Sequence, residues 1–306
     1  MQAEWSHIAR CMSDQLGEKT TLKAPQTIGG GCINQAWKVI DQKNNTWFVK
    51  MNKPSRVSMF EAELQGLEEI INSQSIRTPK PLCVGQTEQH SFLVMEYLEL
   101  RGSPNAVETG AQLAAMHQHS QTSFGSRSSF GWRSSFGWHI DNTIGTTPQI
   151  NTLTSDWISF WKEQRLLFQL NLALNKGFPR HRYNSGVALA ASLDQFFIDY
   201  LPIPSLLHGD LWGGNCSSDE KGNPVIYDPA VYFGDRETDL AMTELFGGFG
   251  NRFMDSYHHH FPIDDGYTTR KTLYNLYHVL NHFNLFGGGY GAQAATMIDS
   301  LLSELR

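Results

Sequence analysis

The chain places an acid in a tight turn, an amide five residues later and a second acid after an apolar run: Asp210, Asn215 and Asp228. That order suits phosphoryl transfer. One carboxylate can accept the proton of an attacking hydroxyl, while an amide oxygen and a second carboxylate can hold Mg2+ against nucleotide phosphates. We therefore predict that Asp210 is the catalytic base, that Asn215 and Asp228 are metal ligands, and that the cofactors are ATP and Mg2+.

The spacing of these groups matches the protein-kinase pattern H-R-D-L-x-x-x-N followed by D-F-G. Here Gly209 replaces the Arg, and Asp228-Pro229-Ala230 replaces the last triplet. A surface turn followed by an ordinary strand is the alternative, and a single His-Gly-Asp triplet would favour it. Three groups in the correct order favour the phosphoryl-transfer interpretation.

Lys50 ends an apolar strand that is similar to the V-A-I-K strand of kinases, whose Lys pairs with nucleotide phosphates. Such a Lys needs an acid to hold it in place, and the next predicted helix offers several. Glu63 shares a helical face with Phe60 and Leu67, so it points inward, whereas Glu61 lies nearly opposite. We predict a Lys50–Glu63 pair, with Glu61 as the alternative. Lys50 alone could also be a solvated strand end.

Gly30 and Gly31 belong to a Gly triplet that ends just before Cys32. Backbone N–H groups in such a loop can approach phosphates without interference from side chains, so we predict that both glycines contact the nucleotide. A plain hairpin turn is the alternative, because Asn34 stands where G-x-G-x-x-G has its third Gly. No Gly-Lys-Ser/Thr follows, which excludes a Walker A loop.

Hydrophobic periodicity predicts an α+β fold of two lobes, and the resemblance to kinase motifs implies a protein-kinase-like arrangement of these lobes. The N-lobe, residues 1–98, is expected to bind the nucleotide with a small, mostly antiparallel sheet carrying one helix. The C-lobe, residues 99–306, is expected to be mainly helical and to carry the catalytic loop, the metal site and the acceptor site. The predicted N-lobe elements are an opening helix at 5–16, strands at 36–40, 46–51, 82–85 and 91–97, and a helix at 58–71.

The C-lobe begins after a connector at Glu96, Tyr97 and Leu98. Backbone groups of such a connector could pair with an adenine edge, so we predict that these three residues bind the nucleotide. Trp212 lies inside the catalytic-type loop and is a candidate substrate contact, with a core position as its alternative. The predicted C-lobe helices are 106–117, 155–174, 187–200, 239–247, 252–259, 270–286 and 292–305.

Composition excludes several other classes of protein. With 40% hydrophobic and 18% charged residues and a net charge of −6, the chain resembles neither a nucleic-acid binder nor a membrane-surface protein. Glu4, Arg10 and Asp14 interrupt the opening segment, so we predict no export signal. The four cysteines lie far apart without a C-x-x-C pair, which favours a reduced, cytoplasmic location.

Beyond the general kinase pattern, the chain resembles one narrower family, the fructosamine/ketosamine-3-kinases, which are related to the aminoglycoside phosphotransferases. The resemblance extends from Gly29 to about Tyr290. Its first motif is L-L-H-G-D-L-W-x-G-N. The matching segments are Leu206–Asn215, Ile226–Ala230, Leu245–Phe249, Phe48–Asn52, Met59–Glu63, Asp141–Gly145 and Asn281–Asn284.

This resemblance implies that Asp210 is the base, that Asn215 and Asp228 hold magnesium, and that Lys50 contacts ATP phosphates. It also implies that the acceptor is the third hydroxyl of a sugar attached to an amine by glycation, and that the phosphorylated product sheds the sugar. The partners would then be small-molecule or protein-bound glycated amines, met by a monomer or a homodimer. Two departures could alter substrate choice: Asp235-Arg236-Glu237, and a duplicated hexapeptide at 127–132 and 133–138.

Two other functions stay open from the sequence. The first is another small-molecule kinase of the same fold, acting on an aminoglycoside or choline. The second is a pseudokinase that binds a nucleotide without turnover. The Trp212 loop disfavours the first, and the intact Asp210, Asn215, Asp228 and Lys50 disfavour the second.

Cys32 generates a prediction about redox sensitivity. Neighbouring N–H groups of a Gly-rich loop stabilise a thiolate, which is the reactive form of cysteine. Members of the family often carry a Cys here, so the resemblance also implies a thiol that can be oxidised or paired with a second chain. Peroxide should therefore lower activity and a reductant should restore it, because oxidation moves the loop off the phosphates. The comparison is wild type against Cys32→Ala, and equal losses in both would contradict the prediction.

Overall fold

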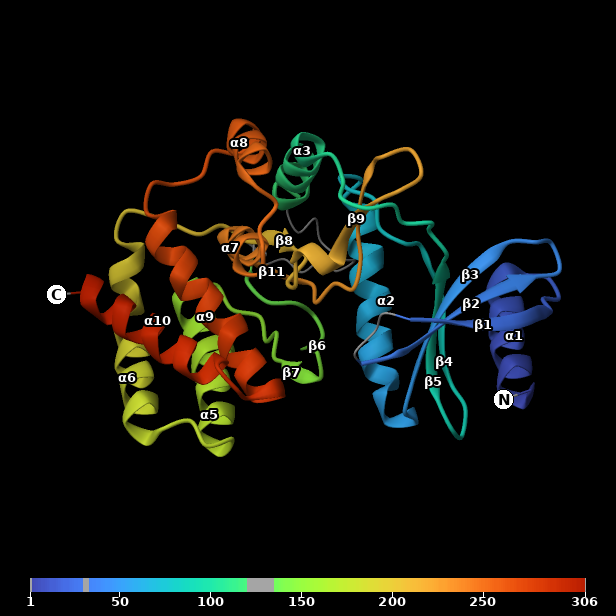
Figure 1. The fold of residues 1–306 in the computed structure, drawn as a ribbon, viewed down its shortest axis with the longest axis horizontal. Helices are drawn as coiled ribbons and strands as arrows, with labels where there is room; N and C mark the ends of the chain where they lie inside the picture. Colours follow the sequence, from blue (N-terminus) through green and yellow to red (C-terminus); the bar gives the residue numbers. More distant parts are fainter. Residues whose placement is uncertain (1, 30–32, 120–134, 306) are drawn as a thin grey trace, which may run out of the picture. The chain divides into compact units, whose positions relative to one another are not determined.

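The computed structural model describes residues 2–29, 33–119 and 135–305. The chain forms two compact units: Met1–Asn105 with Cys216–Pro229, and Ala106–Asn215 with Ala230–Arg306. The predicted α+β class is confirmed, because the first unit holds an antiparallel sheet and the second is mainly helical (Figure 1). The assignment of nucleotide binding to 1–98 and of catalysis to 99–306 stays a prediction.

The first unit is built on a five-stranded antiparallel sheet with the order β1-β2-β3-β5-β4. Its edge strand β1 precedes the first strand predicted above, at 36–40. Pro25 lies in β1 and the register shifts between Lys23 and Gln26, which edge strands tolerate but sequence patterns hide. The elements are α1 (Gln2–Leu16), β1 (Leu22–Ile28), β2 (Gln35–Asp41), β3 (Thr46–Asn52), η1 (Pro54–Arg56), α2 (Val57–Asn72), β4 (Pro81–Gln86), β5 (Ser91–Glu96), β9 (Cys216–Ser218) and β10 (Pro224–Ile226).

Helices cover both faces of this sheet (Figure 1). Alternation along β5 sends Phe92 and Val94 to the face covered by α1, and Leu93 and Met95 to the face covered by α2. Along β3 the same alternation places Val49 with α1 and Phe48 with α2. Lys50, two residues after Phe48, therefore points to the α2 side.

The hairpin of β9 and β10 belongs to the first unit although it lies more than a hundred residues further along the chain. The Arg101 amide donates to the Ser218 carbonyl at 2.8 Å. The backbone of Arg77 forms an isolated β-bridge with Val225, and its side chain forms an ion pair with Asp219 at 2.7 Å. These contacts explain why a segment expected in the C-lobe packs with residues 1–105.

Among the described residues, the second unit contains the β8–β11 pair and thirteen further helical segments and strands. The predicted helices near 106, 239, 252, 270 and 292 are present. The elements are α3 (Ala106–His117), β6 (Asn142–Ile144), β7 (Thr147–Gln149), α4 (Trp157–Phe160), η2 (Trp161–Leu166), α5 (Leu167–Asn175), α6 (Arg180–Ala191), η3 (Leu193–Phe197), β8 (Ser205–Leu207), η4 (Gly213–Asn215), β11 (Tyr232–Gly234), α7 (Glu237–Leu245), α8 (Asn251–His260), α9 (Tyr267–Phe286) and α10 (Tyr290–Glu304).

Two helix predictions for this unit were wrong in their bounds. The predicted helix 155–174 is interrupted by the π-helical segment η2, where the guanidinium of the buried Arg165 lies over the rings of Phe160 and Tyr232. A single insertion of this kind shifts the side chains without ending the helix. The predicted helix 187–200 instead begins at Arg180, after Pro179, and gives way to a 3-10 segment at Leu193.

Within the described ranges, no helix combines the length and the apolar character that crossing a membrane requires.

Candidate active site

Lys50 is the charged centre of the first unit. Its ammonium group lies 2.6 Å from Oδ1 of Asp228 and also contacts Glu63, so the predicted choice of Glu63 over Glu61 is correct. Burial would lower the pKa of Lys50, but the two carboxylates outweigh it and raise the pKa above its ordinary value. Lys50 is therefore a permanent cation held on the α2 face of the sheet.

Asp228 holds an unusual backbone conformation for a residue other than glycine. Its φ is 59°, in the left-handed region, which Asp tolerates better than most residues. About half of its side chain is exposed while Oδ1 contacts Lys50. Backbone strain at a half-exposed acid is typical of functional sites.

The connector after β5 begins at Glu96. The Glu96 side chain accepts a hydrogen bond from Arg77 at 3.0 Å, and its amide donates to Lys80 at 2.8 Å. Tyr97 lies under the ammonium of Lys38, 4.4 Å from its ring centre. The side chains of Glu96 and Tyr97 are thus occupied within the unit, so the predicted contact with adenine concerns their backbone and that of Leu98.

In the second unit, the predicted catalytic loop, Leu206–Asn215, turns at Gly209. Its φ is 81°, and a Cβ added there would lie 2.1 Å from the carbonyl oxygen of Ala230. No side chain fits that space, so Arg cannot occupy this position as it does in the general kinase pattern. The Ala230 amide also donates to the His208 carbonyl at 2.8 Å, which ties the loop to the segment that follows Asp228 in the chain.

Asp239 holds the residues directly before Asp210. Its buried carboxylate accepts the amides of His208 at 2.7 Å and Gly209 at 2.9 Å, and it also contacts Nε2 of His117. Burial would raise the pKa of Asp239, but the hydrogen bond from His117 and the other donors outweigh it and lower the pKa. Burial lowers the pKa of His117, so its neutral ring donates Nε2–H to Asp239 and accepts from Tyr257.

Asn215 is oriented by the same loop. Its Nδ2 donates to the carbonyl of Asp210 at 2.9 Å and to the Asp210 carboxylate at 3.3 Å. Both contacts use the amide nitrogen, so the Oδ1 oxygen faces away from Asp210. Oδ1 has no hydrogen-bond partner in the part of the chain that the structure describes. Amide and carboxylate oxygens are the ligands that Mg2+ prefers, so Asn215 and Asp228 fit that metal chemically.

The hairpin of β6 and β7 holds the segment Ala230–Val231, which we call the return segment. Asn142 donates to the carbonyl of Val231 at 2.7 Å, and Gln149 donates to the carbonyl of Ala230 at 3.1 Å. Gln149 accepts in turn from the Tyr277 hydroxyl at 2.8 Å. The Ala230 carbonyl that excludes a side chain at Gly209 is thereby held in place by a buried amide.

Trp212 projects from the catalytic loop and is 40% exposed, so it is not a core residue. A Cβ added at Gly214 would lie 2.3 Å from its ring. On another side, the ring makes an edge contact with Phe246, with centroids 6.4 Å apart. The Trp212 ring can therefore lie against the loop because Gly214 has no side chain.

Known proteins are similar to this chain along nearly its whole length. The sequence pattern of the fructosamine kinase family matches residues 4–304. The chain belongs to this family. A "probable ketoamine kinase" of Synechocystis sp. is 44% identical over 305 residues, which is 98% of this chain and 97% of that protein.

Two further proteins extend the comparison. The chloroplastic protein-ribulosamine 3-kinase of Arabidopsis thaliana is 41% identical and covers 95% of this chain and 86% of its own length. The crystal structure of a protein assigned as a fructosamine-3-kinase from Haemophilus somnus has a TM-score of 0.85 at 28% identity, over 97% of both chains. The resemblance found in the sequence is confirmed.

Several residues of this fructosamine kinase were missed from its sequence alone. Asn142 lies in a motif that carried the resemblance, yet its role was not assigned. Asp239, His117 and Gln149 gave no signal, because their partners lie far away in the sequence. Of the predicted site, Gly30, Gly31 and Cys32 lie outside the described residues, as does the duplicated segment up to residue 134.

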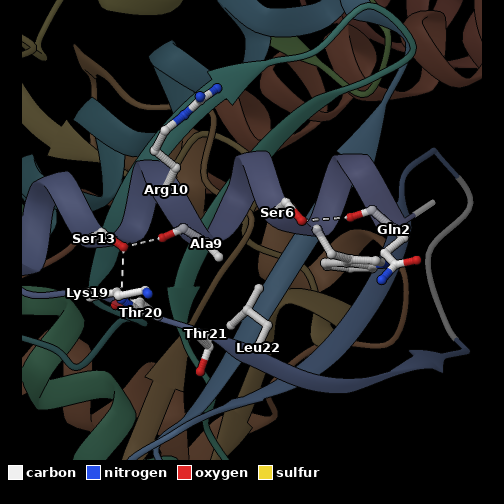
Figure 2. Close-up of a pocket in the computed structure, with 10 residues that line it drawn as sticks. Gln2, Ser6, Ala9, Arg10, Ser13, Lys19, Thr20, Thr21 and Leu22 are labelled. Carbon is white, nitrogen blue, oxygen red and sulfur yellow. Dashed lines mark hydrogen bonds between the residues drawn. The ribbon is translucent and has the colours of Figure 1, made fainter.

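A pocket of about 510 Å³ lies elsewhere in the first unit of the kinase, between α1 and the start of β1 (Figure 2). Its polar groups bond to each other: Ser13 donates to the Ala9 carbonyl at 2.6 Å and accepts from the Thr20 amide at 2.9 Å. None of the predicted site residues lines it, so this pocket is separate from the candidate active site.

Asp239→Asn tests the anchoring of the catalytic loop. Each of the two carboxylate oxygens now accepts a hydrogen bond from one backbone N–H. In Asn the –NH2 group replaces one of these oxygens and would face a backbone N–H, so His208 or Gly209 should shift. A small misplacement of a catalytic group can cost roughly 100-fold in rate, and we expect a loss of that order in kcat with little change in the KM for ATP. Steady-state kinetics and thermal unfolding would be compared with Asp255→Asn, an exposed acid on α8. Unchanged kcat in a folded variant would contradict this anchoring role.

Proposed function

We propose that this fructosamine kinase transfers the γ-phosphoryl group of ATP to the 3-hydroxyl of ketosamines. The observation that carries the proposal is the catalytic loop itself, in which Asp239 and Gly209 fix the backbone around Asp210 and Asn215. The family match over residues 4–304 supports the acceptor class. The named activities of the relatives, a ketoamine kinase and a ribulosamine 3-kinase, point in the same direction.

At the nucleotide end, we assign the phosphate contact to Lys50. Glu63 keeps its ammonium group in place and permanently charged. A fixed cation lowers the energy of charge that develops on the transferred phosphoryl group and needs no reorganisation during the reaction. The backbone of Glu96 to Leu98 is assigned to adenine, and Gly30 and Gly31 to the phosphates.

Asn215 and Asp228 are assigned as the residues that hold Mg2+. Both present an oxygen, and the Asp228 side chain is half exposed. When bound, the ion would neutralise charge on the phosphates that it bridges. Asp210 would remain for the acceptor.

At the acceptor end, Asp210 receives the proton of the 3-hydroxyl. The hydroxyl oxygen forms a bond to the γ-phosphorus, the bond from that phosphorus to the bridging oxygen breaks, and ADP leaves. A sugar hydroxyl has a very high pKa, so the carboxylate accepts the proton late, and positioning supplies most of the rate. The product carries a phosphate next to the carbonyl carbon, which is a better leaving group than hydroxyl and favours release of the amine.

The proposal also covers the form of the substrate, the cellular location and the oligomeric state. Free and protein-bound glycated amines both present the reacting hydroxyl, and the proposal includes both. A cytoplasmic location, and action as a monomer or a homodimer, are also proposed. An aminoglycoside or choline acceptor is the competing function, and an acceptor panel separates the two.

Asp210→Asn combined with that panel tests the function. Wild type should consume ATP with a ribulose-amine or a fructose-amine and not with an aminoglycoside. The variant should retain the fold and ATP binding while turnover falls on the order of 10²–10⁴-fold, the usual contribution of a general base. Turnover of the variant within about threefold of wild type would refute the role of Asp210. Turnover only with the aminoglycoside would refute the acceptor class.

Asp228→Asn tests the metal assignment. Asn tolerates the left-handed backbone at this position, so the change removes charge with little strain. We expect the affinity for ATP in the presence of Mg2+ to fall by roughly tenfold or more, with ATP binding in EDTA less affected. Calorimetry would measure both, with the exposed Asp265→Asn as the control. Unchanged magnesium-dependent affinity together with normal activity would exclude Asp228 as a ligand.

A further inference from the structure

An aromatic cluster in the second unit continues from the catalytic loop. Trp212 contacts Phe246 after the end of α7, and Phe246 contacts the ring of His282 on α9, with centroids 4.8 Å apart. His282 also contacts Phe286 at 5.7 Å and Tyr290 at 5.1 Å. We call these five residues the aromatic cup.

The cup is open to solvent. Trp212, Phe246 and Phe286 are 40%, 36% and 64% exposed, while His282 is half-buried. Large aromatic rings normally bury their area in the core. Three exposed rings in one connected cluster with an imidazole are better explained by a ligand than by packing.

The hydrogen bonds fix the tautomer of His282. Nδ1 lies 2.8 Å from the carbonyl oxygen of His278, and a carbonyl only accepts, so Nδ1 carries the proton. Burial lowers the pKa of His282, which favours the neutral ring. Nε2 then carries a lone pair. Among the residues that the structure describes, none forms a hydrogen bond with it.

Trp212 connects the cup to Asp210. It follows Asp210 by two residues in the same loop, and its ring contacts Phe246, which in turn contacts His282. The cup and Asp210 thus belong to one region of the second unit.

We propose that His282 is a specificity-determining residue whose Nε2 accepts a hydrogen bond from a sugar hydroxyl of the acceptor. The rings of Trp212 and Phe246 then pack against the apolar C–H face of the same sugar. A neutral imidazole between aromatic rings suits a sugar as ligand. The rings cover the C–H face of the sugar, and the imidazole nitrogen accepts a hydrogen bond from one of its hydroxyl groups. This inference rests on the proposed function, since it identifies how the ketosamine is bound.

Two variants separate hydrogen bonding from packing. His282→Phe keeps an aromatic ring in the cup and removes the acceptor. His282→Gln places an amide oxygen near the position of Nε2 and can restore it. His259→Phe, an exposed histidine on α8 outside the cup, is the matched control for the same change.

In wild type, we expect turnover of a fructose-amine. His282→Phe should raise the KM for this ketosamine roughly tenfold, the worth of one hydrogen bond, with the KM for ATP unchanged. His282→Gln should recover most of that loss, and His259→Phe should behave as wild type. Ketosamine analogues that each lack one hydroxyl other than the third give the sharper test. One of them should be a poorer substrate for wild type, yet no poorer than the parent for His282→Phe.

The outcomes distinguish the inference from the function on which it rests. An unchanged KM for the ketosamine in a folded His282→Phe, with the wild-type preference among the analogues intact, overturns the role of His282 while the kinase activity stands. A tenfold loss that His282→Gln does not recover, accompanied by a lower melting temperature, assigns His282 to packing and also overturns the inference. If wild type phosphorylates only an aminoglycoside, the proposed function fails first, and this inference fails with it.

Discussion

The buried carboxylate of Asp239 is the interaction on which the catalytic loop depends. A carboxylate without solvent is costly unless donors surround it, and here two backbone amides and a neutral imidazole supply them. The requirement acts in both directions, because the amides of His208 and Gly209 also need an acceptor in the core. The loop therefore adopts a backbone conformation in which both amides donate hydrogen bonds to the Asp239 carboxylate. This arrangement fixes the backbone directly before Asp210, and Asn215 then bonds to Asp210 through its own amide nitrogen.

A comparable balance of charge controls the first unit. Lys50 is buried between two carboxylates, and its raised pKa shows that their charge outweighs the cost of burial. The pKa of Glu63 is raised by burial and by Asp228, with Lys50 opposing the rise. The cluster thus carries more negative than positive charge when both acids are ionised. An additional cation near Asp228 would relieve that excess, which is consistent with the oxygen ligands assigned to magnesium.

Sequence analysis predicted the parts of this site that depend on local spacing. Glu63 followed from a helical face, and Lys50 from the similarity of its strand to V-A-I-K, because both patterns extend over a few residues. Predictions from local sequence patterns failed where contacts with residues far away in the sequence determine the structure. The π-helical segment accommodates Arg165 among rings of other segments, and β1 depends on the edge of a sheet to tolerate Pro25. Asp239 and Gln149 look like ordinary polar residues until the fold brings their backbone partners to them.

Two of the three glycines in the predicted catalytic loop, Gly209 and Gly214, show how packing determines a motif that looks chemical. Gly209 is required because the Ala230 carbonyl occupies the space of a side chain, and that carbonyl is itself held by Gln149. At Gly214 a Cβ would displace the Trp212 ring, which lies against it. Neither glycine needs to touch a substrate to be indispensable. The replacement of the kinase Arg by Gly209 is therefore not a lost catalytic group. It follows from the close approach of the return segment, and it leaves Trp212 as the large side chain that the loop presents to solvent.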